Sequence, residues 1–248
     1  MGLRTGDANS FFAPTSEQAE ILAERGRCLD ESPADYAMLI DSGGPLLAEM
    51  QQFAASAGAL DRATDYPLEA LGRRLEPDFV LLGPSLNGPI VAGGVVCFPS
   101  SWSLPEKIGQ TLDQTHAPVP DLNPQLAERI RTALDRLPPA EAWERDNWGL
   151  SRDGARDHHP HRDRKRLDET VEPDEIWLRV ERQILYRLPQ TGGILFGIRL
   201  EITPWNEILC SEVAKAGLRR ALETMPSEIA RYKGLLSARS KILGWLTD

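Results

Sequence analysis

The longest alternating stretch of this sequence is Glu175-Ile176-Trp177-Leu178-Arg179-Val180-Glu181-Arg182-Gln183-Ile184-Leu185-Tyr186-Arg187-Leu188. Its even-numbered positions are apolar except for Arg182, and most of its odd-numbered positions are polar. This period of two is typical of a β-strand with one face in the core. A similar stretch at 193–203 follows a turn at 189–192. The two stretches therefore predict a long antiparallel hairpin.

Shorter apolar stretches at 78–83, 89–98 and 145–151 extend the predicted sheet. Amphipathic or capped segments that indicate helices lie at 15–25, 45–57, 105–115, 123–137, 205–224 and from 227 to the end of the sequence. Strands that pair in antiparallel fashion with helices around them define the α+β class. We expect a sheet of about five strands with flanking helices, in a single domain over residues 1–248.

The charge balance argues against a nucleic-acid or membrane partner. The chain of 248 residues has a formal net charge of -9. Proteins that bind phosphates or anionic lipids over a broad surface need an excess of Lys and Arg there. The segment 152–166 is a local exception that is rich in Arg. A charged segment of this kind is expected to be a solvated loop.

The cysteines indicate a reducing compartment. Cys28, Cys97 and Cys210 are odd in number, far apart and without the spacing of a zinc site. No apolar stretch has the length of a signal peptide or of a membrane span. We therefore expect a soluble, cytoplasmic protein that does not enter a membrane.

The polar face of the hairpin has a structural explanation. A three-residue loop at 189–191 would place Glu181 opposite Arg199. The same register would place Arg179 opposite Glu201. Each of these cross-strand pairs contributes about 0.2–1 kcal/mol to stability. On this interpretation the charges stabilise the sheet and have no further role.

The alternative is that this face lines a pocket. In the same register Gly197 lies beside Gln183, and a glycine in a strand leaves space where a side chain would be. Arg, Glu, Gln and Trp side chains around such a space are typical of a ligand site.

The histidines offer two candidate metal sites. His116 stands alone, just before two prolines, and is either an axial ligand of a metal or haem, or a helix-end histidine bonded to a carbonyl. The residues by themselves favour the second interpretation, a helix-end histidine bonded to a carbonyl. The run His158-His159-Pro160-His161 lacks a cysteine or carboxylate pair that would complete a ligand set, so it is expected to be a surface feature. A thiolate ligand at Cys97 is disfavoured because its strand is very apolar. The sequence also contains no nucleophile elbow, phosphate-binding loop or HExxH motif.

Several ordered blocks carry a family resemblance. They are Cys97-Phe98-Pro99-Ser100-Ser101-Trp102, Glu106-Lys107-Ile108-Gly109 with Leu112, His116-Ala117-Pro118-Val119-Pro120, Asn147-Trp148, residues 178–189, residues 194–199 and Tyr232-Lys233-Gly234. Together they resemble the haem-dependent oxidative N-demethylases.

The resemblance implies a PAS-like antiparallel sheet that holds haem b, with helical additions at both ends of the domain. It implies an enzyme that uses dioxygen to oxidise the N-methyl group of a small secondary amine. The products would be a primary amine and formaldehyde. The sequence has no flavin, iron–sulfur or nicotinamide motif. Electrons would therefore come from a separate flavin or iron–sulfur reductase, which the basic loop 152–166 could dock.

The resemblance also implies roles for individual residues. His116 is expected to be the axial iron ligand, since neutral imidazole suits iron. Lys107 and Arg179 are expected to pair with the haem propionates. Glu181 is the candidate distal carboxylate, which would accept the substrate ammonium or relay protons. Trp148, Trp177 and Gln183 are expected to line the amine pocket, where aromatic faces favour a methylammonium.

Two alternatives to the enzyme remain at this stage. One is a PAS-like sensor that binds haem or another ligand without turnover. The other is a haem-free interaction module in which the hairpin charges are only structural.

Overall fold

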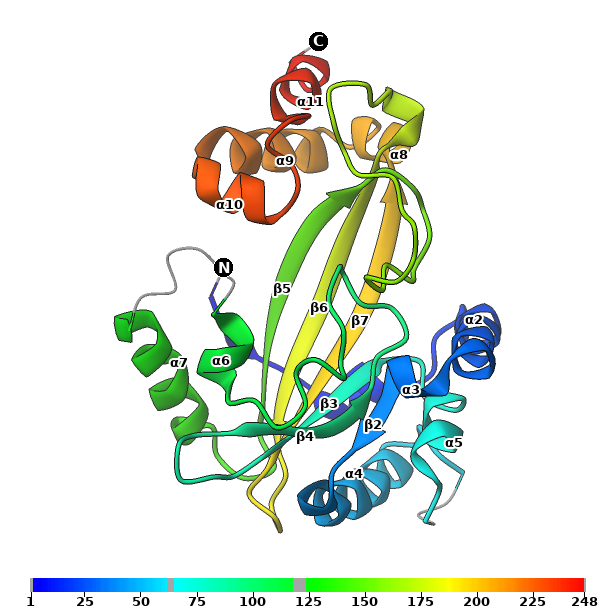
Figure 1. Ribbon diagram of the computed structural model, residues 1–248, viewed down its shortest axis with the longest axis vertical. Helices are drawn as coiled ribbons and strands as arrows, with labels where there is room; N and C mark the ends of the chain where they lie inside the picture. Colours follow the sequence, from blue (N-terminus) through cyan, green and yellow to red (C-terminus); the bar gives the residue numbers. More distant parts are fainter. Residues whose placement is uncertain (1, 62–64, 118–123, 248) are drawn as a thin grey trace.

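The computed structural model describes residues 2–61, 65–117 and 124–247. Within them, a single sheet of seven strands has the order β1-β5-β6-β7-β3-β4-β2, and all neighbours are antiparallel (Figure 1). The strands are β1 (Arg4–Thr5), β2 (Ala37–Leu39), β3 (Asp78–Gly83), β4 (Ile90–Val95), β5 (Ala142–Ser151), β6 (Trp177–Arg187) and β7 (Ile194–Pro204). The predicted α+β class is thus confirmed. The sheet has two more strands than expected, because β1 and β2 are too short to show a period of two.

The helices are α1 (Ala8–Phe12), α2 (Gln18–Glu31), α3 (Pro33–Tyr36), α4 (Gly44–Ser56), α5 (Leu68–Gly72), α6 (Leu112–His116), α7 (Pro124–Arg136), α8 (Trp205–Leu209), α9 (Glu212–Thr224), α10 (Ser227–Tyr232) and α11 (Arg239–Trp245). Short 3₁₀ turns lie at Asp41–Gly43 and Pro173–Glu175. No helix formed by these described segments is long and apolar enough to cross a membrane.

Local capping explains where two predicted helices differ from the observed ones. The segment predicted as a helix over 105–115 is helical only from Leu112, because Thr111 and Gln114 form a reciprocal capping box there. The segment predicted as one helix over 205–224 is divided into α8 and α9. Ser211 separates them, since its side chain accepts the backbone N–H of Ala214 and begins a new helix.

The predicted register of the long hairpin is wrong by one residue. Glu181 lies opposite Leu200, and Arg182 lies opposite Arg199. The turn contains four residues, with Gly192 in the left-handed region at φ 69°. It is held by Glu49 of α4, whose carboxylate accepts the N–H groups of Gln190 at 2.6 Å and of Thr191 at 2.8 Å. This contact from a distant helix could not be read from the hairpin itself.

The register shift removes both predicted cross-strand ion pairs. Arg199 donates to Glu76 at 2.7 Å and to the carbonyl oxygens of Phe11 and Ala13. Glu201 pairs instead with Arg182 at 3.2 Å, where both side chains are exposed. The charges of the hairpin therefore connect the sheet to the N-terminal segment more than they connect the two strands to each other.

The space expected at Gly197 is filled. Gly197 lies opposite Ile184, not beside Gln183. A Cβ atom at position 197 would lie 2.8 Å from the ring of Phe11 and 2.9 Å from both Phe12 and Ile184. The absent side chain makes room for α1, so the prediction of a pocket at this glycine is wrong.

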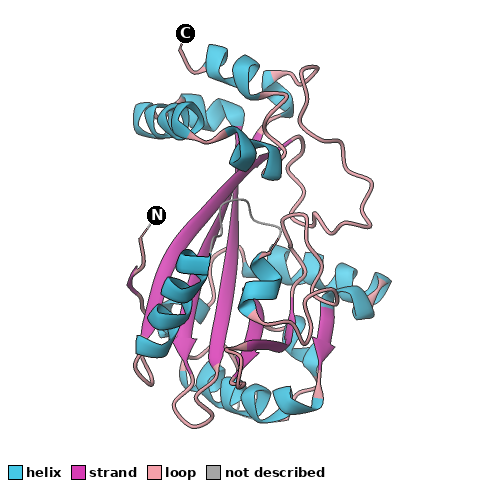
Figure 2. Ribbon diagram, turned by 60° about the vertical axis from the view of Figure 1, so that its left-hand side comes forward, coloured by secondary structure: helices cyan, strands magenta, loops and turns pink. Residues whose placement is uncertain are grey.

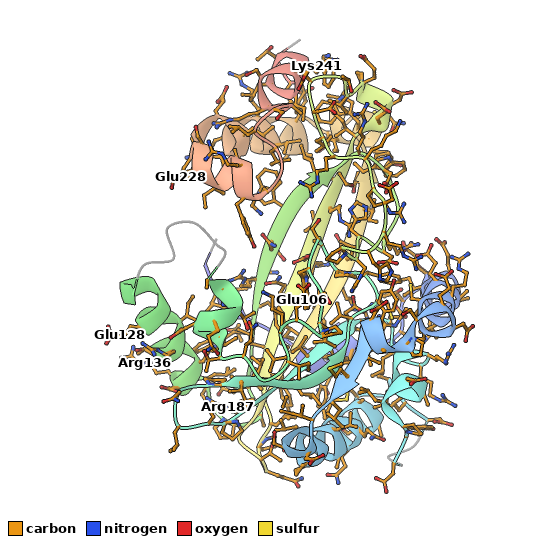
Figure 3. The ribbon with its side chains drawn as sticks, in the orientation of Figure 1. Glu106, Glu128, Arg136, Arg187, Glu228 and Lys241 are labelled. Carbon is orange, nitrogen blue, oxygen red and sulfur yellow. The ribbon has the colours of Figure 1, made fainter. Side chains whose placement is uncertain are left out.

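The long strands connect two groups of helices. Arg187 marks the lower end of β6, and Lys241 of α11 marks the helical group at the top (Figure 3). The upper group, α8 to α11, packs on the far ends of β5 and β6 through a core that includes Ile176, Trp205 and Leu222 (Figure 2). The lower body has one core around Phe79 and Met50 and another around Val80 and Leu104. Between these cores, one face of β5 and β6 carries the polar residues Arg145, Asn147, Arg179, Glu181 and Gln183, and β7 continues this face.

Candidate functional site

A row of polar residues crosses β5 and β6. Residues opposite each other in an antiparallel pair lie on the same face of the sheet. The opposed pairs here are Arg145 with Gln183, Asn147 with Glu181, and Gly149 with Arg179. On β7 this face continues with the apolar residues Ile198, Leu200 and Ile202. The face therefore combines a polar half with an apolar half.

Glu181 is at the middle of this row. It is only 7% exposed. Its Oε2 accepts hydrogen bonds from Gln183 Nε2 at 2.8 Å and from Asn147 Nδ2 at 3.2 Å. The ion pairs found among the described residues do not include Glu181; Arg199 pairs with Glu76, and Arg182 pairs with Glu201. The direct hydrogen bonds to this carboxylate therefore come from neutral amides, and the charges of Lys233 and Arg179 act on it without an ion-pair contact.

Lys233 approaches the same row from the end of α10. Its Nζ donates to the carbonyl oxygen of Trp148 at 2.6 Å and to Asn147 Oδ1 at 3.1 Å. Burial lowers the pKa of Lys233, while the charge of Glu181 opposes this shift. Gly234 then turns the chain with φ at 68°. Sequence reasoning assigned no role to Lys233, although the block Tyr232-Lys233-Gly234 was among the segments that carry the resemblance.

The two tryptophans predicted for the amine pocket lie in different places. Trp148 lies opposite Val180, so it belongs to the face opposite that of Glu181. Its ring centroid is 5.6 Å from Lys233 Nζ. Trp177 shares the face of Glu181, but it lies four residues away, about 13 Å along the strand. Gly154 packs against the Trp177 ring. The structure therefore brings Gln183 to Glu181 but neither tryptophan.

Arg179 holds a loop against the sheet. It is 4% exposed, and it donates to the carbonyl oxygens of Ala155 at 2.6 Å and Arg156 at 2.9 Å. Its Nε is buried without a partner among the described residues. Burial lowers the pKa of Arg179 to about 10, while the charge of Glu181 opposes the shift. One donor of this guanidinium thus remains for a further acceptor.

The first half of loop 152–166 is packed, whereas residues 163–166 are exposed, as predicted for a solvated loop. Arg156 binds Glu20 at 2.8 Å and Glu24 at 2.9 Å on α2. Arg162 binds Glu31 and Asp157, each at 2.6 Å. Part of the positive charge that suggested a docking surface is therefore neutralised within the chain.

His116 ends α6 and is half-buried. Its Nδ1 lies 2.9 Å from the carbonyl oxygen of Leu112, and a carbonyl can only accept, so Nδ1 carries the proton. Nε2 of the neutral ring is then the basic nitrogen that a metal requires. Burial lowers the pKa of His116, and the charges of Arg145 and Lys107 add to this effect. Since Arg145 belongs to the polar row, His116 lies within electrostatic reach of that face. The prolines that follow His116 in the sequence lie outside the described residues.

Lys107 lies near the same histidine. Its Nζ donates to the carbonyl oxygen of Thr115 at 3.4 Å. Lys107, Arg145 and the free donor of Arg179 are the cations around this face that match carboxylate groups of a ligand. A neutral imidazole, cations and the apolar residues of β7 are the kinds of group that a haem with its propionates would require.

Two other positions do not fit a haem. Cys97 is fully buried in the core, and the neighbouring Cys28 thiol and burial raise its pKa, so it is a thiol and not a thiolate ligand. The hollows beside Tyr186 and beside Arg187 have volumes of about 180 Å³ and 100 Å³. Both are below the range of roughly 300–1,000 Å³ that is typical of cofactor pockets.

The comparison with protein families agrees with the sequence blocks. The family model described as haem-dependent oxidative N-demethylase, alpha subunit-like, matches residues 43–243. This range includes β3 to β7, His116, Glu181 and Lys233. The chain therefore belongs to the haem-dependent oxidative N-demethylase alpha subunit-like family.

Proposed function

We propose that this chain is the haem b-binding subunit of a monooxygenase that removes an N-methyl group from a small secondary amine. Two electrons and two protons reduce one atom of dioxygen to water. The other oxygen atom leaves with the methyl carbon as formaldehyde, and the nitrogen leaves as a primary amine. Bound haem would supply the redox-active iron for this chemistry. A separate flavin or iron–sulfur reductase supplies the electrons.

The protein residues around the haem have distinct roles in this proposal. His116 ligates the iron through Nε2, and its bond to the Leu112 carbonyl orients the ring. Lys107 and Arg179 pair with the propionates. Arg145, which the sequence did not single out, joins them because its charge acts on His116.

The observation that best supports an enzyme over a passive haem binder is the state of Glu181. Glu181 is a buried carboxylate whose direct hydrogen bonds come from neutral amides, while the cations Lys233 and Arg179 act on it only electrostatically. A cation that reaches the carboxylate directly would bind well, because little water is present to screen the charge. A protonated methylamine is such a cation. Glu181 accepts its N–H, while Gln183 and Asn147 keep the carboxylate in one orientation. The second role proposed for Glu181 is the relay of protons during turnover.

The wider setting is also part of the proposal. The sheet is PAS-like and residues 1–248 form one domain. Trp177, about 13 Å along β6 from Glu181, would line the approach to the amine pocket and not the pocket itself. Trp148 acts indirectly by supporting Lys233. The free cysteines Cys28, Cys97 and Cys210 support a reducing, cytoplasmic location.

The test uses the full chain loaded with haem and supplied with dioxygen and a chemical or enzymatic electron donor. Formaldehyde is measured with a series of small N-methylamines and with amines of similar size that lack an N-methyl group. We expect formaldehyde only from the N-methylamines, in a one-to-one ratio with the primary amine. A haem spectrum without formaldehyde from any amine would assign the chain to the sensor class, and absence of haem binding would reject both.

A further inference from the structure

A second cluster of ligating side chains involves the middle of loop 152–166. It comprises Asp35 of α3 with His159 and His161, which Pro160 separates. One ring nitrogen of each histidine and one carboxylate oxygen of Asp35 all lie within 4.8 Å of one another. The sequence-based expectation that these histidines are a surface feature is wrong for His159, which is 5% exposed.

Hydrogen bonds explain the positions of two of these three side chains, His161 and Asp35. His161 Nδ1 lies 2.9 Å from Asp35 Oδ2, and this carboxylate oxygen also accepts from Ser32 Oγ at 2.6 Å. His161 Nε2 lies 3.2 Å from the hydroxyl of Tyr36. A histidine and an aspartate in this arrangement need no metal to be stable.

His159 is not explained in this way. Its Nδ1 accepts the backbone N–H of His161 at 3.3 Å, so the neutral ring carries its proton on Nε2. Nε2 is buried and has no partner among the residues described. A buried polar group without a partner destabilises the fold. In this tautomer Nε2 is a donor without an acceptor in the described part of the chain. In the other tautomer, which gives up only the 3.3 Å contact with the His161 N–H, Nε2 offers a lone pair that a metal ion can bind.

The surrounding charge favours a cation. The carboxylates of Asp35, Asp157 and Glu106 act electrostatically on the His159 ring. Glu106 comes from the segment between β4 and α6, which passes in front of the long strands (Figure 3). The nearby cation Arg162 is already paired with Asp157 and Glu31. Negative charge thus exceeds positive charge around the cluster.

We propose that Asp35, His159 and His161 bind a divalent transition-metal ion of the zinc type. Two imidazoles and one carboxylate match the preference of such ions and leave a fourth position for water. At zinc, bonds of about 2.0–2.1 Å separate neighbouring ligand atoms by about 3.4 Å. The side chains must therefore move together by about 1 Å, which the exposed His161 permits.

The proton positions are compatible with this change. When Nδ1 of His161 binds the metal, its proton moves to Nε2, which then donates to the Tyr36 hydroxyl. Tyr36 in turn donates to Asp157 at 2.8 Å. A histidine ligand that donates to such an outer partner is the usual arrangement at metal sites. His159 binds through Nε2, and its proton moves to Nδ1, so the long contact with the His161 N–H is lost.

The site would fasten the loop that Arg179 holds. The carbonyl oxygens bound by Arg179 belong to Ala155 and Arg156, a few residues before His159. A metal bridge from this loop to α3 would fix its middle as well. The ion would therefore have a structural role, separate from the haem-binding face.

Binding of Zn²⁺ alone to the chelator-treated, haem-free full chain tests the proposal by titration calorimetry and equilibrium dialysis. We expect one Zn²⁺ per chain, and at least a tenfold weaker affinity in His159→Ala, His161→Gln and Asp35→Asn. His158→Ala is the matched control, because His158 pairs with Asp153 at 3.1 Å and is not part of the cluster. Affinity in His158→Ala and in His116→Ala should be unchanged.

Circular dichroism of each variant separates loss of a ligand from loss of the fold. Asp35 is partly exposed and His161 is exposed, so these two variants are expected to fold even if His159→Ala does not. The proposal is overturned if the wild-type chain binds no stoichiometric Zn²⁺. It is also overturned if folded Asp35→Asn and His161→Gln bind as tightly as wild type, or if His158→Ala weakens binding equally.

Discussion

The face of β5 and β6 and the Asp35–His159–His161 cluster differ in how they are built. On the strand face, Asn147, Glu181 and Gln183 are placed by sheet register, and their hydrogen bonds satisfy one another. The cluster joins a short helix to a loop, and it leaves one buried nitrogen unpaired. A site on strands can be inferred from periodic sequence, whereas a site between a loop and a helix depends on tertiary contacts. The predictions below test this contrast.

The largest effect is expected at the haem ligand. His116→Ala should lose haem, because the basic Nε2 is the nitrogen available to iron on this face. The loss of affinity should exceed the roughly 10- to 100-fold change that outer-shell substitutions cause. The Soret band after haem reconstitution and desalting measures it, with His158→Ala as the control that retains haem. An intact band in His116→Ala would show that another residue ligates the iron.

Glu181→Gln tests the carboxylate of the strand face. It keeps the size and the acceptor oxygen of the side chain but removes the charge. Haem should be retained, and kcat/KM for formaldehyde formation should fall by about 10²-fold. A rise in KM would indicate lost ammonium binding, and a fall in kcat would indicate lost proton transfer. Arg182→Gln, on the other face of the same strand, is the control, since its exposed ion pair contributes about 0–1 kcal/mol.

Gly197→Ala tests the side of the sheet opposite the site. The new methyl group would lie within 2.9 Å of Phe11, Phe12 and Ile184, so the free energy of unfolding should fall by about 1–3 kcal/mol. Urea denaturation measures this change. Gly217→Ala in α9 is the control, because no atom lies within 4 Å of the added carbon. It should stabilise the helix by up to about 1 kcal/mol. Equal stability of the two variants would contradict the packing of α1 on Gly197.

The smallest effect is a change of stability with pH at Glu76. Burial alone would raise the pKa of Glu76, but bonds from Thr15 and Arg199 outweigh it and lower the pKa below the ordinary 4.5. The unfolded state then binds a proton more readily than the folded state. The stabilisation is complete above about pH 4.5 and is lost as the pH falls through the lower folded value. Thermal melts between pH 7 and pH 3 should show a shallower acid decline for Glu76→Gln than for wild type.

The long hairpin shows how far sequence patterns reach. Its strands and their alternation were predictable, because a period of two follows from the geometry of a β-strand. Its register was not, because Glu49 of a distant helix holds a four-residue turn where three residues were expected. The one-residue shift changed every cross-strand pair and removed the predicted partners of Glu181 and Arg179.

The candidate site likewise combines residues that the sequence predicted with residues that only the fold revealed. The roles of His116, Lys107, Arg179 and Glu181 were predicted from the family resemblance, and Gln183 was predicted from the polar face of the hairpin; the family is confirmed over residues 43–243. Lys233 and Arg145 were not identified, since a single Lys or Arg carries no signal until the fold places it beside Glu181 or His116. Trp148 was expected in the pocket, but strand alternation places it on the opposite face.

The sequence by itself therefore determined the α+β class, the long hairpin and the family, because periodicity and local motifs depend on neighbouring residues. Only the tertiary structure decided the register, the packing of loop 152–166 and the meeting of Asp35 with His159 and His161. Those features depend on contacts between segments far apart in the chain. Hydrogen bonds and burial at such contacts produce no periodic pattern in the sequence.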